Sequence, residues 1–215
     1  IVDSFGDVLG MQCLALGMER FKQDVVDALV EEVHPQGIYE RSDVPVRRLE
    51  GLEQLTGVMY GTVPDRVEMV ENGVHFWVDV KEGQKTGFFL DQRENRQLVK
   101  RYAKGRTVLN TFCYTGGFSV YALSGGAGEV CSVDSSERAV ALATENMQLN
   151  FGDNAAHSEV AADAVDYLKD IGDKYDLIIL DPPAFAKHHK VLGNAMQGYK
   201  RLNARALSQI RPGGI

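Results

Sequence analysis

The residues of this chain that are best suited to chemistry lie in three segments, each of which follows a short apolar run. The first run leads into Asn110-Thr-Phe-Cys-Tyr-Thr-Gly-Gly-Phe118, the second ends at Asp134, and the third ends at Asp181. Gly116 and Gly117 allow the backbone to approach a ligand closely at the start of a helix. An apolar strand, a tight turn and a helix in this order predict a site for a nucleotide-type ligand.

The turn at Gly116-Gly117 favours a ligand without phosphates. Dinucleotide enzymes open this turn to a pyrophosphate with the pattern G-x-G-x-x-G, whereas the turn here is surrounded by the bulky Phe112, Tyr114 and Phe118. S-adenosylmethionine carries no phosphate and combines an adenosine with a charged amino-acid tail. The sequence therefore favours S-adenosylmethionine over a nicotinamide dinucleotide as the cofactor.

Two acidic residues suit the adenosine of such a ligand. Asp134 lies 17 positions after Gly117 and suits the ribose hydroxyls, and Asp163 in Ala161-Ala-Asp-Ala-Val165 suits the adenine amine. An acidic residue after a strand is also a common helix cap, so a purely structural role stays open for each of them. Their joint placement with the turn favours the ligand-binding interpretation.

The corner Asp181-Pro-Pro-Ala-Phe185 is suited to hold a planar base. Prolines fix the backbone and remove amide hydrogens, so a base can stack against Phe185 while Asp181 hydrogen-bonds its Watson–Crick edge. Cytosine fits this arrangement, and so do guanine and adenine. A structural alternative stays open as well, because Asp-Pro-Pro can simply end a strand.

The elements that must position these residues alternate between strand and helix after residue 105. Such alternation predicts a parallel sheet with helices on both faces. It also places Asn110 and the acidic residues at the carboxyl ends of strands, where ligands bind in such sheets. The predicted strands are 107–111, 129–133, 157–161 and 176–180, and the predicted helices are 117–124, 136–150, 164–171 and 195–209.

The first part of the chain has a different pattern, which predicts a small α+β unit. Apolar residues at helical spacing from Met18 to Val33 predict one helix with a single buried face, and residues 37–42 predict a short strand. Asn72-Gly73 between alternating apolar runs predicts a hairpin over 67–80. We therefore expect two domains, residues 1–84 and 85–215. The apolar positions are Phe21, Val25, Val26, Leu29, Val30 and Val33 in the helix, and Val74, Phe76, Val78 and Val80 on one face of the hairpin.

The composition limits the cell compartment and the kinds of binding partner that we expect for this chain. The 215 residues are 44% apolar with a net charge of −7, which argues against nucleic-acid binding through bulk positive charge. No two of the three cysteines form a CxxC pair, and His188-His189 lacks a partner at zinc-ligand spacing, so neither a disulfide framework nor a metal site is predicted. We expect a cytoplasmic protein without a membrane span or signal peptide. Ile1 and Ile215 both look like cut ends.

Basic residues cluster locally in spite of the acidic total. Such clusters are often only solvated faces, but beside an RNA active site they can hold phosphates. They are Lys187-His-His-Lys190, Lys200, Arg201 and Arg205 after the Asp-Pro-Pro corner, and Arg41, Arg47 and Arg48 in the first unit.

Together these segments resemble the consecutive motifs of the ribosomal RNA large subunit methyltransferase I-type family. Its members are class I S-adenosylmethionine-dependent enzymes that methylate C5 of a cytosine in large-subunit ribosomal RNA. The resemblance covers nearly the whole chain. The segments that carry it are Ile38-Tyr-Glu-Arg-Ser-Asp43, Arg47-Arg48-Leu-Glu-Gly51, Gly87-Phe-Phe-Leu-Asp-Gln-Arg93, Asn110 to Phe118, Asp134-Ser, Asp163-Ala and Asp181-Pro-Pro-Ala-Phe185.

The resemblance implies a Rossmann-like class I methyltransferase domain with a mostly parallel sheet, truncated at its C-terminus, after a small α+β domain that faces RNA. It implies S-adenosyl-L-methionine as cofactor and large-subunit ribosomal RNA as partner. Family members usually carry an N-terminal PUA RNA-binding domain as well. The implied cofactor-binding residues are Lys85, Phe89, Gln92, Arg93, Asn110, Phe112, Tyr114, Thr115, Gly116, Asp134, Ser135, Asp163, Ala164 and Asp181, and the implied catalytic residues, for base recognition, are Asp181 and Phe185.

The segment from Gly87 to Arg93 has two interpretations. By resemblance it closes over the methionine moiety, with Arg93 or Gln92 meeting the carboxylate and Lys85 in a similar part. From its residues alone it can equally be a hydrophobic staple and a cap for the helix that follows, to about Ala103.

Methylation at C5 of cytosine requires a covalent route, because C5 is a weak nucleophile. A thiolate adds to C6, C5 attacks the methyl group, and a base then removes the C5 proton. None of Cys13, Cys113 and Cys131 is a convincing nucleophile, and the resemblance implies a cysteine beyond Ile215 in a Ser-Cys-Ser motif. N-methylation of guanine or adenine in ribosomal RNA therefore stays open, as do a cofactor-binding RNA-interaction module without turnover and a homodimer through the hairpin.

Overall fold

The computed structural model describes residues 1–185 and 192–215. The chain divides into two compact units, Ile1–Asp91 and Gln92–Ile215. Each unit has its own main sheet and its own apolar core. Within the described residues, no helix combines the length and the apolar character needed to cross a membrane.

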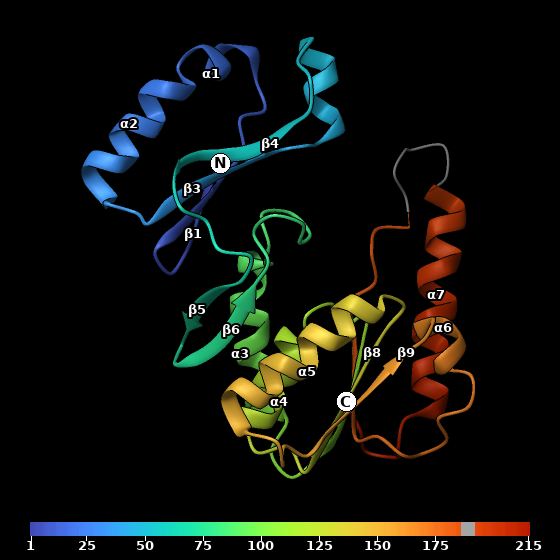
Figure 1. The fold of residues 1–215 in the computed structure, drawn as a ribbon. Helices are drawn as coiled ribbons and strands as arrows, with labels where there is room; N and C mark the ends of the chain where they lie inside the picture. The colour runs from blue at the N-terminus through green and yellow to red at the C-terminus, as the bar shows by residue number, and fades with distance from the viewer. Residues whose placement is uncertain (186–191) are drawn as a thin grey trace. The chain divides into compact units, whose positions relative to one another are not determined.

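The first unit is built on a mixed sheet with the strand order β1-β2-β3-β4. β2 and β3 are parallel, and the two outer pairs are antiparallel. Helices α1 and α2 form the crossover that a parallel pair requires (Figure 1). The elements are β1 (Val2–Phe5), β2 (Val8–Met11), α1 (Leu16–Arg20), α2 (Lys22–Val33), β3 (Gly37–Ser42), the 3₁₀ helix η1 (Pro45–Glu50) and β4 (Leu55–Gly61).

The prediction of one helix from Met18 to Val33 with a single buried face is wrong in part. The helix breaks at Phe21, whose φ of −100° and ψ of 8° end α1 and begin α2. Phe21 and Val33 are 59% and 52% exposed. The apolar residues of α2 that pack against the sheet are Val25, Val26, Leu29 and Val30 in its middle turns.

The predicted hairpin is confirmed, with strands β5 (Val67–Glu71) and β6 (Val74–Val78). Asn72 and Gly73 both have left-handed φ values, 52° and 77°, as a two-residue turn of this kind requires. All four apolar residues on the predicted face are buried, and Phe76 packs against Phe88 with ring centroids 4.9 Å apart. Local turn chemistry and alternation therefore account for this element. The 3₁₀ helix η2 (Leu90–Gln92) follows.

The second unit confirms the predicted parallel sheet. The strand order is β10-β7-β8-β9, and all three pairings are parallel. The backbone of Ile215 continues this pattern beside β10 through hydrogen bonds with Asp176 and Ile178. The elements are α3 (Arg93–Tyr102), β7 (Thr107–Thr111), α4 (Gly117–Ser124), β8 (Glu129–Asp134), α5 (Glu137–Phe151), β9 (His157–Ala161), α6 (Ala164–Tyr167), β10 (Leu177–Leu180) and α7 (Leu192–Gln209).

Helices cover both faces of this sheet (Figure 1). Side chains alternate between the two faces along each strand. Leu109 points into a core with Ala164 and Leu168 and with Leu202 of α7. Its neighbour Asn110 points to the other face and hydrogen-bonds Ser119 of α4. The element bounds match the predictions closely, except that α6 ends at Tyr167 rather than residue 171 and α7 begins at Leu192 rather than 195.

Candidate functional site

The loop that follows β7 has an unusual backbone. Phe112, Tyr114 and Gly116 have φ values of 55°, 47° and 76°. Bulky residues rarely adopt this left-handed conformation, and each such residue costs on the order of 1–3 kcal/mol unless its surroundings hold it. Strain of this kind clusters at functional sites. The loop is therefore the first place in the second unit where a binding role has structural support.

Three hydrogen bonds hold this loop in place. The amide of Tyr114 donates to Oδ2 of Asp134 at 2.9 Å, and Nδ2 of Asn146 donates to the carbonyl of Thr115 at 2.9 Å. The amide of Cys113 donates to the carbonyl of Val133 at 3.0 Å. The loop is thus fixed to the end of β8 and to helix α5, so its geometry is set before any ligand binds.

Gly116 is required at the end of this loop for two reasons. Its φ is left-handed, and a Cβ built on it would lie 2.8 Å from Cβ of Ala143 in α5. Only glycine meets both conditions without a shift of the helix. The close approach lets the N-terminus of α4 lie at the carboxyl end of the sheet.

A chain of buried polar side chains lies beneath the loop. Nδ2 of Asn110 donates to Oγ of Ser119 at 2.8 Å, and the Oγ atoms of Ser119 and Ser132 are 2.6 Å apart. Ser132 Oγ is 2.8 Å from Nε2 of His157. Burial lowers the pKa of His157, although Glu159 acts in the opposite direction, so this imidazole is neutral at neutral pH.

Two buried oxygens in this region lack a hydrogen-bond partner within the described part of the chain. They are Oδ1 of Asn110 and Oγ1 of Thr115. A buried polar atom without a partner costs about 1–3 kcal/mol, and such atoms often mark the place of an absent ligand or water. Both can accept a hydrogen bond from an ammonium or a hydroxyl group, which S-adenosylmethionine carries. The residues present therefore fit the predicted cofactor.

The two acidic residues assigned to the adenosine lie on neighbouring strand ends. Asp134 is the last residue of β8 and pairs in register with Ala161 of β9, two residues before Asp163. Oδ1 of Asp134 also accepts from the amide of Ser136 at 3.0 Å. The exposed Ser135 lies between these groups on the same edge.

Asp163 fills the structural role that the sequence left open. Its carboxylate caps α6 by accepting a hydrogen bond from the amide of Asp166 at 2.9 Å. Ala164, which follows it, is buried in the core beneath α6. A second role for Asp163 toward adenine stays a prediction.

Asp181 follows β10 directly, and the register of β10 with β7 places it next to Phe112. Phe185 lies farther along and packs on α7, with its ring centroid 4.5 Å from that of Tyr199. The amide of Phe185 donates to Oη of Tyr199 at 3.3 Å. A Cβ on Gly198 would lie 2.9 Å from the Phe185 ring, so this glycine makes room for it. The ring is therefore held in one orientation; base stacking on it stays a prediction.

The segment before α3 is divided between the two units. Lys85, with a left-handed φ of 54°, pairs with Asp91 at 2.9 Å and lies 4.5 Å from the ring centroid of Phe89. In the second unit, Gln92 accepts from Nδ2 of Asn95 at 2.7 Å, and Arg93 pairs with Glu94 at 3.2 Å. The four residues predicted here for the methionine moiety therefore keep that role as a prediction.

The three cysteines are all buried free thiols. Burial, followed by the negative charge of Asp134, raises the pKa of Cys113 far above its ordinary value. Burial also raises the pKa of Cys13. A protonated, buried thiol is a poor nucleophile, which agrees with the sequence-based view that Cys113 does not attack a base.

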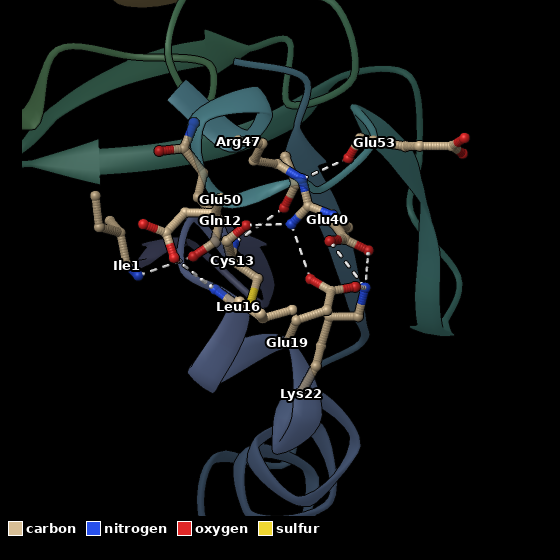
Figure 2. A network of polar contacts seen from close by, with 11 residues as sticks. Ile1, Gln12, Cys13, Leu16, Glu19, Lys22, Glu40, Arg47, Glu50 and Glu53 are labelled. Carbon is tan, nitrogen blue, oxygen red and sulfur yellow. Dashed lines mark hydrogen bonds and ion pairs between the residues drawn. The ribbon is translucent and has the colours of Figure 1, made fainter. Parts of the chain in front are cut away.

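The sequence left two roles open for the basic residues of the first unit, a solvated face or phosphate binding, and neither applies to Arg41 and Arg47, because both are buried. Arg47 is 1% exposed and donates from Nη1 to Oε2 of Glu19 at 2.8 Å and to the carbonyl of Cys13 (Figure 2). Arg41 is 6% exposed and donates to the carbonyl of Val80 at 3.1 Å. Both arginines hold the fold of this unit instead. Residues 187–190 of the other basic group, His188 and His189 included, lie outside the described residues.

Sequence reasoning missed several residues that support the site. Ser132 and Asn146 are polar residues at positions where the spacing of apolar residues in β8 and α5 predicts an inward-facing side chain, and this signal is readable in the sequence. Ser119, His157 and Tyr199 gave no comparable signal, since their roles depend on partners that are distant along the chain.

Comparison with known proteins gives a consistent picture. Residues 51–215 match the sequence model for S-adenosylmethionine-dependent methyltransferases. The chain is 45% identical over its whole length to ribosomal RNA large subunit methyltransferase I of Aeromonas hydrophila subsp. hydrophila, and 46% identical to that of Tolumonas auensis. It spans only 55% of each of these relatives.

A solved structure supports the same fold. The crystal structure of SMU.776 complexed with SAH matches 97% of this chain and 54% of the other chain, with a TM-score of 0.79 and 32% sequence identity.

Proposed function

Because this chain belongs to the family of S-adenosylmethionine-dependent methyltransferases, we propose that its second unit binds S-adenosylmethionine and supports methyl transfer to a base of large-subunit ribosomal RNA. The observation that carries this proposal is the strained loop after β7, fixed to Asp134 by the amide of Tyr114. A carboxylate and a close-packed glycine at the carboxyl ends of parallel strands suit an adenosine without phosphates. The names of the relatives at 45–46% identity support the RNA substrate.

The residues divide the binding of the cofactor between them. Asp134 binds the ribose hydroxyls, and Asp163 the adenine amine. Asn110 and Thr115 offer their unpartnered oxygens to donors of the ligand. The cofactor, when bound, supplies an electrophilic methyl group on a sulfonium.

The acceptor is proposed to be C5 of a cytosine. Asp181 follows β10 and is suited to hydrogen-bond the edge of a base, while Phe185 is held rigid by Tyr199. The covalent route to C5 needs a thiolate, and burial keeps Cys113 and Cys13 protonated at neutral pH. The proposal therefore requires a nucleophile other than these two thiols. Ribosomal RNA as substrate and three unpaired thiols both suit a cytoplasmic enzyme.

Two measurements test this function. Calorimetry should show binding of S-adenosylhomocysteine to the chain and no binding of NADH; the reverse result would refute the cofactor assignment. In the second, the complete protein is incubated with isotope-labelled S-adenosylmethionine and large-subunit ribosomal RNA, and the RNA is digested to nucleosides. Label in 5-methylcytidine is expected, whereas label in a methylated guanosine or adenosine would establish N-methylation instead.

A further inference from the structure

A cavity of ≈ 380 Å³ opens in the second unit between α6, α7 and Phe185. From its shape and charge we infer that this cavity receives a nucleoside of a single-stranded RNA segment, whose flanking phosphates bind Arg201 and Arg205. The inference rests on the proposed function, because it names where a nucleoside of that RNA is held beside α7; Phe185, proposed above for base recognition, forms one wall of this cavity. It concerns the face of α7, which the cofactor site at β7 and β8 does not use.

The interior of the cavity is apolar and preformed. It is lined by Ala195 and Leu202 of α7, which are 5% and 2% exposed, and by Val165 of α6, which is 37% exposed. Binding cavities for small ligands typically measure about 300–1,000 Å³ and have mainly apolar walls. A single base is therefore of suitable size and chemistry to fill this one.

The aromatic wall is fixed in place. Phe185 packs on Tyr199, and the absence of a side chain at Gly198 lets the ring approach the helix. Single-stranded RNA is recognised mainly by unstacked bases that pack on aromatic rings or on guanidinium planes. A ring that is already ordered loses little entropy when a base packs on it.

The charge of the cavity points to a polyanion. Arg201 and Arg205 lie four residues apart, so they occupy successive turns on one side of α7. Neither forms an ion pair with another described residue, and none of the described residues that line the cavity is acidic. Guanidinium groups bind phosphates in a bidentate manner and also stack on bases. An apolar cavity with this rim matches a base attached to its phosphates.

The test measures affinity for a short fluorescein-labelled single-stranded RNA of mixed sequence by fluorescence anisotropy at several salt concentrations. In the double variant Arg201→Ala and Arg205→Ala, affinity should fall about 10- to 100-fold. The plot of log Kd against log salt concentration should become shallower by about 1.4, since each lost phosphate contact on a single strand contributes about 0.7.

The matched control is Arg101→Ala with Lys104→Ala, which removes the same charge from the end of α3 and the turn after it. A second variant, Val165→Phe, fills the cavity without changing the charge. It should lower RNA affinity about 5-fold or more with an unchanged salt slope. Calorimetry with S-adenosylhomocysteine reports whether each variant is still folded.

The outcomes separate this inference from the proposed function. If the arginine variant binds RNA as the control variant does, or if Val165→Phe binds RNA as the wild type does, the cavity does not receive a nucleoside and the inference fails, while the methyltransferase function stands. If the wild type binds S-adenosylhomocysteine but no single-stranded RNA, the inference fails together with the RNA part of the proposed function.

Discussion

The backbone amide of Tyr114 donates a 2.9 Å hydrogen bond to Oδ2 of Asp134, across the ends of two neighbouring parallel strands. The other carboxylate oxygen accepts from the amide of Ser136 at 3.0 Å. One side chain therefore orders the loop on its left-handed backbone and the turn into α5. The same carboxylate is proposed to bind the ribose, so loop geometry and cofactor binding depend on one residue.

Substitution of Asp134 should separate these two roles. Asp134→Ala removes both, and the affinity for S-adenosylhomocysteine should fall about 10- to 100-fold, the equivalent of a lost charged hydrogen bond. Asp134→Asn keeps an oxygen that can accept a hydrogen bond from the amide of Tyr114 but loses the charge. Its affinity for S-adenosylhomocysteine should therefore lie between those of the wild type and Asp134→Ala. Calorimetry provides the measurement, and Asp166→Ala, which removes an exposed carboxylate from α6, provides the control. Wild-type affinity in Asp134→Ala would exclude the ribose role.

Gly116→Ala should destabilise the second unit through a specific contact. The new Cβ would meet Ala143 at 2.8 Å on a backbone with a φ of 76°, and we expect a loss of about 1–3 kcal/mol in the free energy of unfolding together with weaker cofactor binding. Gly51→Ala is a matched control, because Gly51 has a φ of 71° and its new Cβ would have no neighbouring atom within 4 Å. Urea denaturation followed by circular dichroism measures the free energy of unfolding of both variants. Equal losses in the two variants would show that backbone strain alone matters.

Much of the fold could be predicted because its signals are local. The hairpin depends on Asn72-Gly73 and on alternation over a few residues, and the strands of the parallel sheet are short apolar runs between turns. The prediction failed at Phe21, where helical spacing continued although the helix did not, and the apolar residues packed on the sheet come from the middle of α2. Periodicity shows which residues are apolar but not how far the sheet beneath them extends.

The site was predictable only in its outline. Asp134 and the glycine turn can be recognised by residue type and position, whereas the contact of Asn146 with Thr115 spans 31 residues and that of Phe185 with Tyr199 spans 14. Arg47 was expected at the surface, on a solvated face or near phosphates, because charged residues are seldom buried. Its partners come from separate segments, Cys13, Glu19 and Glu53, and no sequence pattern brings these together.

The ion pair of the buried Arg47 with the partly exposed Glu19 should make the first unit sensitive to acid. The Arg47 guanidinium lowers the pKa of Glu19 from 4.5 to about 2. A carboxylate with a lowered folded-state pKa stabilises the fold above its unfolded pKa, and this contribution is lost as pH falls from about 4.5 toward about 2. Because Glu19 is partly exposed, we expect the contribution to be about 1–2 kcal/mol at neutral pH.

The fluorescence of Trp77, the single tryptophan of the chain, reports unfolding of this unit. Glu19→Gln should remove the part of the loss in stability that this carboxylate contributes as pH falls from about 5 toward about 2, the window set by its unfolded and folded pKa values. Arg47→Ala should cost more, about 3–5 kcal/mol, because it leaves buried partners without their cation. Asp65→Asn, at an exposed pair with Lys81, is the control. An unchanged acid profile in Glu19→Gln would show that the pair does not govern acid stability.

Cys113 should be unreactive toward thiol reagents although it lies in the loop after β7, which is proposed to bind the cofactor. Burial and the nearby carboxylate of Asp134 raise the pKa of Cys113, so at neutral pH its thiol is protonated and shielded from solvent. Iodoacetamide should therefore leave Cys113 unmodified in the native chain and alkylate it in urea, as mass spectrometry of the digested chain would show. Ser135→Cys places a thiol on the exposed part of the same edge and should react readily under native conditions. Rapid native alkylation of Cys113, or loss of methyl transfer in Cys113→Ser without loss of S-adenosylhomocysteine binding, would instead make this cysteine the nucleophile.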